Sequence, residues 1–373
     1  MCEPCLRPTT RRTKETVIVR VVSQRARQFH QNHPICDMLG LNLNHPRFVL
    51  DDTDLTQRAE DHFRGDFPKF GDWGMNLVVA KGGVTLLTDE YRALWNLQPE
   101  RRAKRDGESL FLTLAVPNAT QTVLAELDRF LLNVEKAPDS VHLVRTVSDL
   151  DGSREAGKVA LLMAANRADW FGDSPGVLRQ FSRLGLRMIT IGQATRELGW
   201  DPSSETRSGG RLTELGVRMI AEMNQCGILI DLAHSNDPCA LDVIEISETP
   251  VVDTHSCPRA LSPGENRAIP DEVMRAISKR GGVLGIMPPI SRQPGEAPFE
   301  TIDPDEMAST LEQIRYAVDV MGVEAVGIGT HFTTALMPAL TDALLDDGFT
   351  EADTAAIMGG NFLRVLRQVL PES

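Results

Sequence analysis

Three of the eight histidines in this sequence stand directly after short apolar runs. His234 follows ILIDLA, His255 follows VVDT and His331 follows GIGT. If these runs are parallel strands of one barrel, the residues that follow them meet at one end of it. Neutral imidazoles that converge in this way can hold zinc or iron. The three histidines are therefore candidate metal ligands; the alternative is that each caps a loop or hydrogen-bonds a carbonyl group.

The elements that would position these histidines alternate between apolar runs and longer helical patterns, which is typical of a parallel sheet covered by helices. Eight strands are predicted, at His33–Asp37, Val84–Leu87, Val159–Met163, Arg187–Ile191, Ile228–Leu232, Pro250–Thr254, Val283–Met287 and Ala325–Ile328. Helices are predicted at Gln121–Val134, Gly176–Leu184, Leu212–Cys226, Pro238–Ser247, Asp271–Lys279 and Asp305–Met321. Eight such units in about 300 residues favour an α/β fold of the (β/α)8 barrel type, with an open doubly wound sheet as the alternative.

The same pattern divides the chain into a basic N-terminal extension, residues 1–30, which is expected to be partly flexible, and one barrel domain, residues 31–373. Gly82–Gly83 and Gly281–Gly282 each precede a predicted strand, where they are expected to end a helix. Trp200–Arg211 and Pro288–Pro304 follow predicted strands and are long polar or proline-rich segments. Both are expected to be loops at the catalytic end of the barrel.

The composition excludes several classes of function. The net charge is −13, from 52 acidic and 39 basic residues, and a chain of that sign repels nucleic-acid phosphates. No run of about 18 apolar residues occurs, so a membrane span is not expected, and the first residues lack the apolar core of a secretory signal. The six cysteines include one isolated C-x-x-C, Cys2 and Cys5. Reduced thiols and a cytoplasmic location are the simplest expectation.

Uncharged polar residues follow two other predicted strands. Asn166 lies in LLMAANRADW and Gln193 in ITIGQATRE. Amide side chains are poor zinc ligands because they carry no charge, but they can hydrogen-bond a substrate amide. The first strand offers Asp37, in HPICD, as a carboxylate.

These motifs resemble the membrane dipeptidase (renal dipeptidase) family. The resemblance covers most of Gly157–Val365 and rests on GKVALLMAANRADWFGDSPGVLRQFSRLGLRMITI, GGRLTELGVRMIAEMNQCGILIDLAHSND, ETPVVDTHSCPRALSPGENRAIPDEVMRAISKRGGVLGIMPP, GVEAVGIGTHF and IMGGNFLRV. It implies a (β/α)8 barrel, often dimeric, with a two-zinc site that cleaves dipeptides. His234 and His255 correspond to two histidine ligands of one metal, and Arg267 corresponds to the arginine that grips a substrate carboxylate.

Other positions depart from the family pattern. The first strand of the family ends in H-x-D, where this sequence has Leu39 and Leu41; an alternative alignment places Asp52 and Asp54 there. The bridging glutamate aligns with Asn166, a substrate-contacting histidine with Gln193, and the catalytic aspartate with His331.

We therefore expect a dipeptidase-like hydrolase with one divalent ion at most, zinc by preference, held by His234 and His255. His331 would be the third ligand or the general base. Asn166 and Gln193 would orient the amide of a small amino-acid-derived or dipeptide substrate, and Arg267 would bind its carboxylate. Two alternatives stay open: an inactive homologue that binds a peptide-like ligand or a partner protein, and a metal-free enzyme in which His331 and His255 perform acid–base chemistry.

Overall fold

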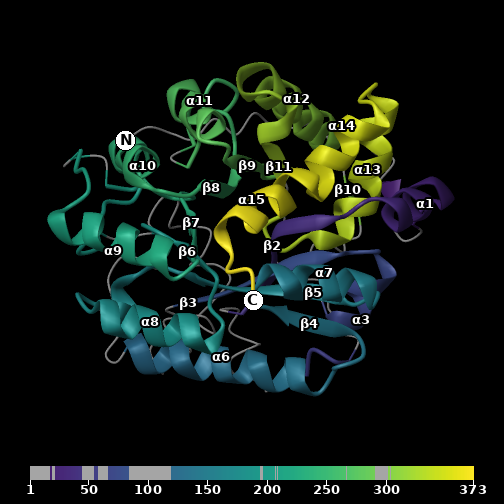
Figure 1. The fold of residues 1–373 in the computed structure, drawn as a ribbon. Helices are drawn as coiled ribbons and strands as arrows, with labels where there is room; N and C mark the ends of the chain where they lie inside the picture. The colour runs from purple at the N-terminus through teal and green to yellow at the C-terminus, as the bar shows by residue number, and fades with distance from the viewer. Residues whose placement is uncertain are drawn as a thin grey trace, which may run out of the picture.

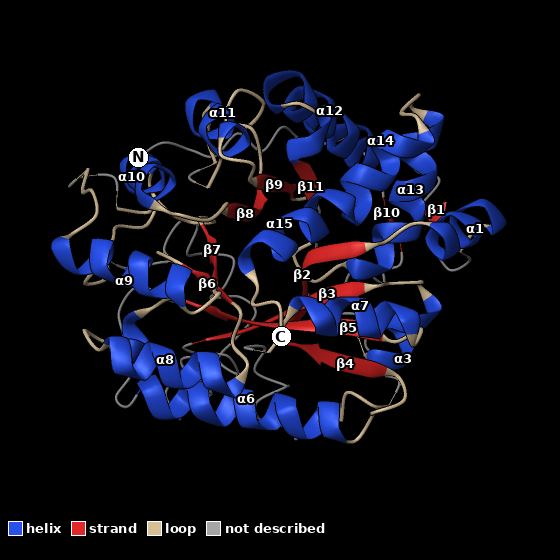
Figure 2. Ribbon diagram, viewed as in Figure 1, coloured by secondary structure: helices blue, strands red, loops and turns tan. Residues whose placement is uncertain are grey.

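The computed structural model describes residues 17–18, 22–43, 54–57, 66–83, 119–193, 196–205, 207, 209–265, 267–289, 301–302 and 304–373. In this part of the chain, parallel strands form a nearly closed barrel at the centre of the molecule, and helices surround it (Figures 1 and 2). The barrel strands in sheet order are β11 (Val326–Ile328), β9 (Val283–Ile286), β8 (Val252–Ser256), β7 (Leu229–Asp231), β6 (Met188–Thr190), β5 (Val159–Asn166), β3 (Leu77–Gly83) and β2 (Cys36–Asn42). This is the predicted (β/α)8 fold.

Two pairings lie beside this path. β4 (Val141–Val144) adds to β5 in parallel, and β1 (Val17–Ile18) pairs with β10 (Thr301–Ile302) in antiparallel orientation. The helices are α1 (Gln24–Asn32), α3 (Phe67–Asp72), α6 (Ala119–Glu135), α7 (Val147–Glu155), α8 (Pro175–Leu184), α9 (Glu214–Gln225), α10 (Asp237–Ile246), α11 (Asp271–Lys279), α12 (Pro304–Met321), α13 (Met337–Asp346), α14 (Glu351–Ala355) and α15 (Asn361–Val369). Short 3₁₀ or π turns occupy Asp169–Phe171, Val323–Ala325, Thr334–Leu336 and Ala356–Gly360.

The predicted helices are all present, with ends displaced by two residues at most. Local signals explain this accuracy: Ser174 and Asn236 cap α8 and α10 by accepting backbone N–H groups, and each helix carries a proline in its first turn. None of the helices in the described ranges is both long and apolar enough to cross a membrane.

The second barrel strand differs from the prediction. The predicted strand Val84–Leu87 lies outside the described residues, and the observed strand β3 runs over Leu77–Gly83. Gly82–Gly83 therefore lies inside a strand and does not end a helix. The expectation that this pair ends a helix was wrong because Gly82 and Gly83 pair with Ala165 and Asn166 of β5, and this sheet pairing outweighs the turn preference of glycine.

The N-terminal ends of the strands are closed by an apolar layer. Inward-facing side chains near the strand starts, such as Leu77, Ala160 and Leu229, form one buried cluster with Phe362 and Leu366 of α15. Figure 1 shows α15 lying across this end of the barrel. Because α15 fills the N-terminal end, the polar chemistry is left to the carboxyl ends of the strands.

The boundary that we predicted at residue 30 falls inside α1, which packs against α13. Arg25 Nη1 lies 2.7 Å from Asp346 Oδ1. His30 is buried and hydrogen-bonds the carbonyl of Trp73 and the hydroxyl of Thr341, at 2.7 and 2.9 Å. His30 is thus a packed residue that ties α1 to the rest of the barrel.

Asp37 joins the two ends of the sheet, β2 and β11. Its Oδ1 accepts the backbone N–H groups of Leu39 and Thr330, and its Oδ2 accepts the hydroxyls of Thr330 and Thr334, at 2.6–3.0 Å. Burial raises the pKa of Asp37, although these four hydrogen bonds oppose the effect. Each oxygen of the Asp37 carboxylate therefore already accepts two hydrogen bonds from the protein. The role of Asp37 is to close the barrel between β2 and β11.

We predict that Asp37→Ala lowers the free energy of unfolding by about 3 kcal/mol, because four buried donors lose their acceptor. Chemical denaturation measures this change. Asp54→Ala is the control, since Asp54 is exposed and its side chain hydrogen-bonds only Thr56 among the interactions described; it is expected to change stability by less than about 0.5 kcal/mol. Equal stability of the two variants would contradict the role assigned to Asp37.

Candidate metal and substrate site

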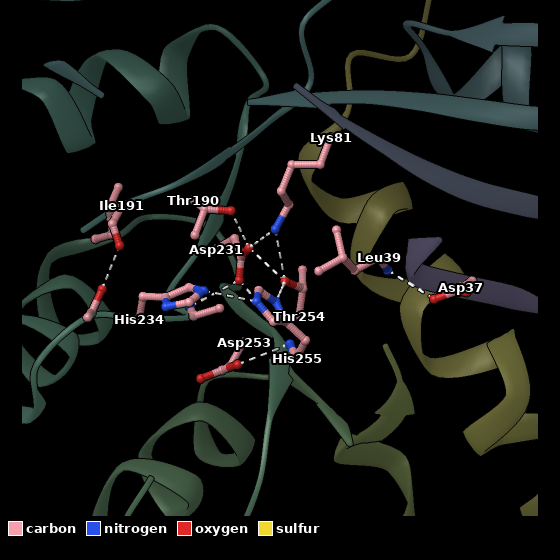
Figure 3. Close-up of polar contacts among 12 residues, drawn as sticks. Asp37, Leu39, Lys81, Thr190, Ile191, Asp231, His234, Asp253, Thr254 and His255 are labelled. Atoms are coloured by element: carbon pink, nitrogen blue, oxygen red, sulfur yellow. Dashed lines mark hydrogen bonds and ion pairs between the residues drawn. The ribbon is translucent and has the colours of Figure 1, made fainter. Parts of the chain in front are cut away.

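The centre of the site is a buried ion pair between β3 and β7. Lys81 and Asp231 are fully buried, and Lys81 Nζ lies 2.8 Å from Asp231 Oδ2 (Figure 3). The same carboxylate oxygen accepts the hydroxyls of Thr190 and Thr254, while Oδ1 accepts the N–H groups of Ala233 and Thr254. Burial alone would raise the pKa of Asp231, but the Lys81 charge and these hydrogen bonds outweigh it and lower the pKa.

Thr254 links this ion pair to His255. Thr254 Oγ1 lies 2.7 Å from Asp231 Oδ2 and 2.7 Å from His255 Nδ1. His255 Nε2 in turn lies 3.1 Å from His234 Nε2. Figure 3 shows the chain of contacts running from Lys81 through Asp231 and Thr254 to the two imidazoles. The ends of β7 and β8 thus bring together the two histidines that the sequence predicted to be neighbours.

The spacing of the two Nε2 atoms fits two ligands of one ion. A tetrahedral zinc ion about 2.0–2.1 Å from each nitrogen requires the nitrogens to be about 3.3 Å apart, close to the observed 3.1 Å. Within the described ranges, however, no three His, Cys, Asp or Glu side chains are grouped so that together they could hold an ion. The fit therefore extends to His234 and His255, and further ligands would have to come from His331 after a rearrangement, from water or from substrate.

His331 lies beside this pair but does not complete a three-imidazole cluster in this structure. Its ring centroid is 5.3 Å from that of His255, and the rings are inclined by 35°. The residue is exposed to solvent, unlike buried His255. Its predicted role as a third ligand stays a prediction, and its position next to His255 is equally compatible with the predicted role of general base.

Backbone strain marks the same rim. The residues Arg167, His234, His331 and Phe332 have φ values of 60°, 71°, 53° and 77°, in the left-handed region that costs a non-glycine residue about 1–2 kcal/mol. They follow β5, β7 and β11 at the carboxyl ends of the strands. Surrounding hydrogen bonds hold the strain: Phe332 N–H donates to the Leu39 carbonyl, and Ser203 N–H to that of His234. Such clustering of strain is typical of functional sites.

The charges around the histidines are positive. Burial, followed by the charges of Arg267 and Lys81, lowers the pKa of His234 well below its usual value. Burial, followed by the Lys81 charge, does the same to the pKa of His255. Desolvation of the ring, followed by the charges of Arg267 and Lys81, lowers the pKa of His331 to about 3. The imidazoles are therefore neutral at physiological pH, and neutral imidazole is the form that binds a metal or accepts a proton.

Arg267 lies in the loop after β8, and we call the region between it and the three histidines, at the carboxyl ends of the strands, the recess. Its guanidinium contacts Met287 Sδ at 3.7 Å and lies 3.7 Å from Glu265 Oε1. The long distance to Glu265 leaves a guanidinium that can take a second carboxylate. Its positive charge also contributes to lowering the pKa of all three histidines.

The two predicted amide residues differ in how well the structure defines them. Asn166 is buried at the end of β5, aligned with Thr190 of β6, which is itself aligned with Asp231 of β7. Among the described residues its Oδ1 has no hydrogen-bond partner. An acceptor without a donor in a buried position suits a ligand N–H group. Gln193 is half-buried and directly precedes 194–195, which lie outside the described part.

Two buried acidic residues, Asp231 on β7 and Asp253 on β8, support His255. Asp231 acts through the hydroxyl of Thr254. Asp253 accepts the backbone N–H of His255 at 3.3 Å. Its pKa is raised to about 7 by burial and then by the Asp231 charge. Asp52 lies outside the described residues.

Sequence reasoning missed Lys81, Thr190 and Thr254. The one available signal was a lysine inside the apolar run LVVAKGG, since lysine is almost never fully buried without a partner.

Comparison with known proteins places these observations in a family. The model of the membrane dipeptidase family, peptidase family M19, matches residues 89–371. Dipeptidase verJ of Clonostachys rogersoniana is 28% identical over 285 residues, which cover 73% of this chain and 70% of the relative. Dipeptidase 3 of Mus musculus is 29% identical over 242 residues, which cover 60% of this chain and 47% of the relative. The matched region thus spans about half to 70% of the length of these relatives.

Solved structures share the fold at lower identity. The probable dipeptidase PvdM from Pseudomonas aeruginosa has a TM-score of 0.74 at 20% identity, covering 94% of this chain and 98% of that one. A metallopeptidase from Rhodobacter sphaeroides, liganded with a phosphinate mimic of the dipeptide L-Ala-D-Ala, has a TM-score of 0.72 at 23% identity, covering 90% and 99%.

The influence of Arg267 on the histidines can be tested in metal-free protein. We predict that Arg267→Met raises the pKa of His331, because a nearby positive charge that disfavours imidazolium is removed. NMR titration of the ring protons measures the change. Arg259→Met is the matched control, since Arg259 is in the same segment but pairs with Asp237 at 2.6 and 2.7 Å. An unchanged pKa of His331 in Arg267→Met would show that the guanidinium does not face the recess.

Proposed function

The chain belongs to the membrane dipeptidase family (peptidase family M19), and on that premise we propose that it hydrolyses a C–N bond in a small amino-acid-derived amide such as a dipeptide. One divalent ion at most would be held by His234 and His255. The observation that carries the proposal is the 3.1 Å separation of their Nε2 atoms at the end of a barrel whose other end is filled.

The number of ions is limited by the acids nearby. Asp37 and Asp231 are both buried and are fully engaged in hydrogen bonds within the barrel. Neither carboxylate is therefore directed at the recess as a bridging ligand, and zinc, which we prefer among divalent ions, would complete its shell with His331, water or substrate.

The residues around the histidines suit a substrate with a carboxylate and an amide. Arg267 would pair with the carboxylate, and Asn166 Oδ1 would accept an N–H group of the substrate, while Gln193 would hydrogen-bond the amide. A bound ion would polarise the amide carbonyl as a Lewis acid. Neutral His331 would accept the proton of the attacking water and return it to the leaving amine as the C–N bond breaks.

A second candidate is a non-catalytic protein that binds a peptide-like ligand or a partner protein at this recess. It is favoured by the lack, among the described residues, of any three-ligand group. A metal-free enzyme that uses His331 and His255 is the third possibility. The cytoplasmic location and the homodimer expected above stay predictions.

We predict about one zinc ion per chain in protein purified without chelator, and loss of that ion in His234→Ala and His255→Ala, because each removes one of two paired ligands. Elemental analysis measures the ion content. His142→Ala is the control. His142 lies on the outer strand β4, where its imidazole pairs with Asp149 of α7, and the variant is expected to bind as much zinc as the wild type. Less than about a tenth of an ion per chain in the wild type would contradict the metal site.

We further predict that the wild type hydrolyses members of a dipeptide panel and that His331→Ala lowers kcat by about 10²–10⁴-fold while the metal content stays constant, as expected when a general base is removed. Steady-state kinetics test this. Loss of the ion in His331→Ala would assign His331 as a ligand. Turnover without bound metal would support the metal-free enzyme, and absence of both metal and turnover would support the binding protein.

A further inference from the structure

Every contact between Lys81 and His234 can be assigned a hydrogen-bond direction. Asp231 is a carboxylate and only accepts, and the Lys81 ammonium only donates. Thr254 has a single hydroxyl proton and lies 2.7 Å from both Asp231 Oδ2 and His255 Nδ1. If that proton went to His255, two oxygen lone pairs would face each other at 2.7 Å. The Thr254 hydroxyl therefore donates to Asp231.

The remaining directions follow from this one. Since Thr254 donates to Asp231, its oxygen must accept the proton of His255 Nδ1, and it also accepts a proton from Lys81 Nζ at 3.2 Å. His255 Nε2 then carries a lone pair, which accepts the Nε2–H of His234 in metal-free protein. From His234 through His255 and Thr254, each hydrogen bond is therefore donated in the direction of the Asp231 carboxylate.

The opposite arrangement is equally self-consistent once Asp231 is protonated. A neutral Asp231 would donate to Thr254, Thr254 would donate to His255 Nδ1, and His255 would hold its proton on Nε2. The ammonium of Lys81 excludes this state by stabilising the carboxylate at 2.8 Å in a fully buried position. We propose that Lys81 is a positioning residue that fixes His255 as the Nδ1–H tautomer and thereby directs its Nε2 lone pair into the recess.

Orienting His255 explains why a lysine is buried here, since a buried ion pair is not needed for stability. Lys81 is fully buried and lies on β3, which carries neither histidine. A metal-ligating histidine depends on the group bound to its other nitrogen for its tautomer and orientation. The inference about the tautomer of His255 does not depend on the proposed function. Only the effect of that tautomer on metal binding rests on the proposed function.

The experiment uses the full-length, chelator-treated protein with ¹⁵N-labelled histidine. Long-range ¹H–¹⁵N correlation spectra near neutral pH identify the protonated ring nitrogen of each neutral imidazole, and His255→Gln assigns the resonances. The wild type is expected to show His255 protonated on Nδ1. Lys81→Met, which removes the charge but keeps the length of the side chain, is expected to move the proton to Nε2.

Thr254→Val provides a second test that leaves the ion pair in place. It removes the hydroxyl between Asp231 and His255, so the Nδ1–H preference of His255 is expected to be lost even though Lys81 still neutralises Asp231. Adding Lys81→Met to Thr254→Val is then expected to cause no further change in tautomer. If Lys81→Met alone fails to fold, the comparison of wild type with Thr254→Val decides the question.

The proposal is overturned if wild-type His255 carries its proton on Nε2, if folded Lys81→Met keeps the wild-type tautomer, or if Thr254→Val does. Calorimetric titration with Zn²⁺ separates this result from the proposed function. If wild-type His255 is the Nδ1–H tautomer and Thr254→Val binds Zn²⁺ about 10–100-fold more weakly than the wild type, both the inference and the proposed metal site are supported. A correct tautomer with no Zn²⁺ binding in the wild type retains the inference and rejects the metal site.

Discussion

A positive charge inside the barrel is the constraint on which the rest of the site depends. Lys81 and Asp231 lie on β3 and β7, which are not neighbours in the sheet, so the two side chains meet across the barrel interior. Removing one partner of such a pair costs about 3–5 kcal/mol, whereas replacing both by apolar groups is often neutral or stabilising. The pair is therefore better explained by what it orients, the Thr254 hydroxyl and through it His255, than by its contribution to stability.

The same constraint determines which groups face the recess. Asp231 is committed to Lys81, and Asp37 is committed to closing the seam between β2 and β11. The groups left at the rim are neutral imidazoles and the guanidinium of Arg267. A site of this composition attracts a carboxylate and accepts protons, and among the described residues no three His, Cys, Asp or Glu side chains are grouped to hold an ion. The chain thus belongs to the membrane dipeptidase family, and we propose that its metal centre is altered.

The sequence predicted the features that depend on local patterns. Helix caps defined α8 and α10, and the runs before His234 and His255 placed both residues at strand ends, where they meet. Features that depend on partners far away in the chain could not be predicted from the sequence. Lys81 finds its partner 150 residues later in the chain, and no periodicity reports such a pairing. The Gly82–Gly83 pair appeared to be a turn because its pairing with β5, about 80 residues later in the chain, is not visible locally.

The position of a bound ion relative to the Lys81–Asp231 pair is the most direct test of how this site works. A crystal structure of the zinc-soaked protein, with anomalous diffraction at the zinc edge, locates it directly. We expect one peak within about 2.0–2.1 Å of both His234 Nε2 and His255 Nε2, with Lys81 Nζ still bonded to Asp231. Two peaks, or one peak bound to Asp231 with the lysine displaced, would contradict the central role of the ion pair.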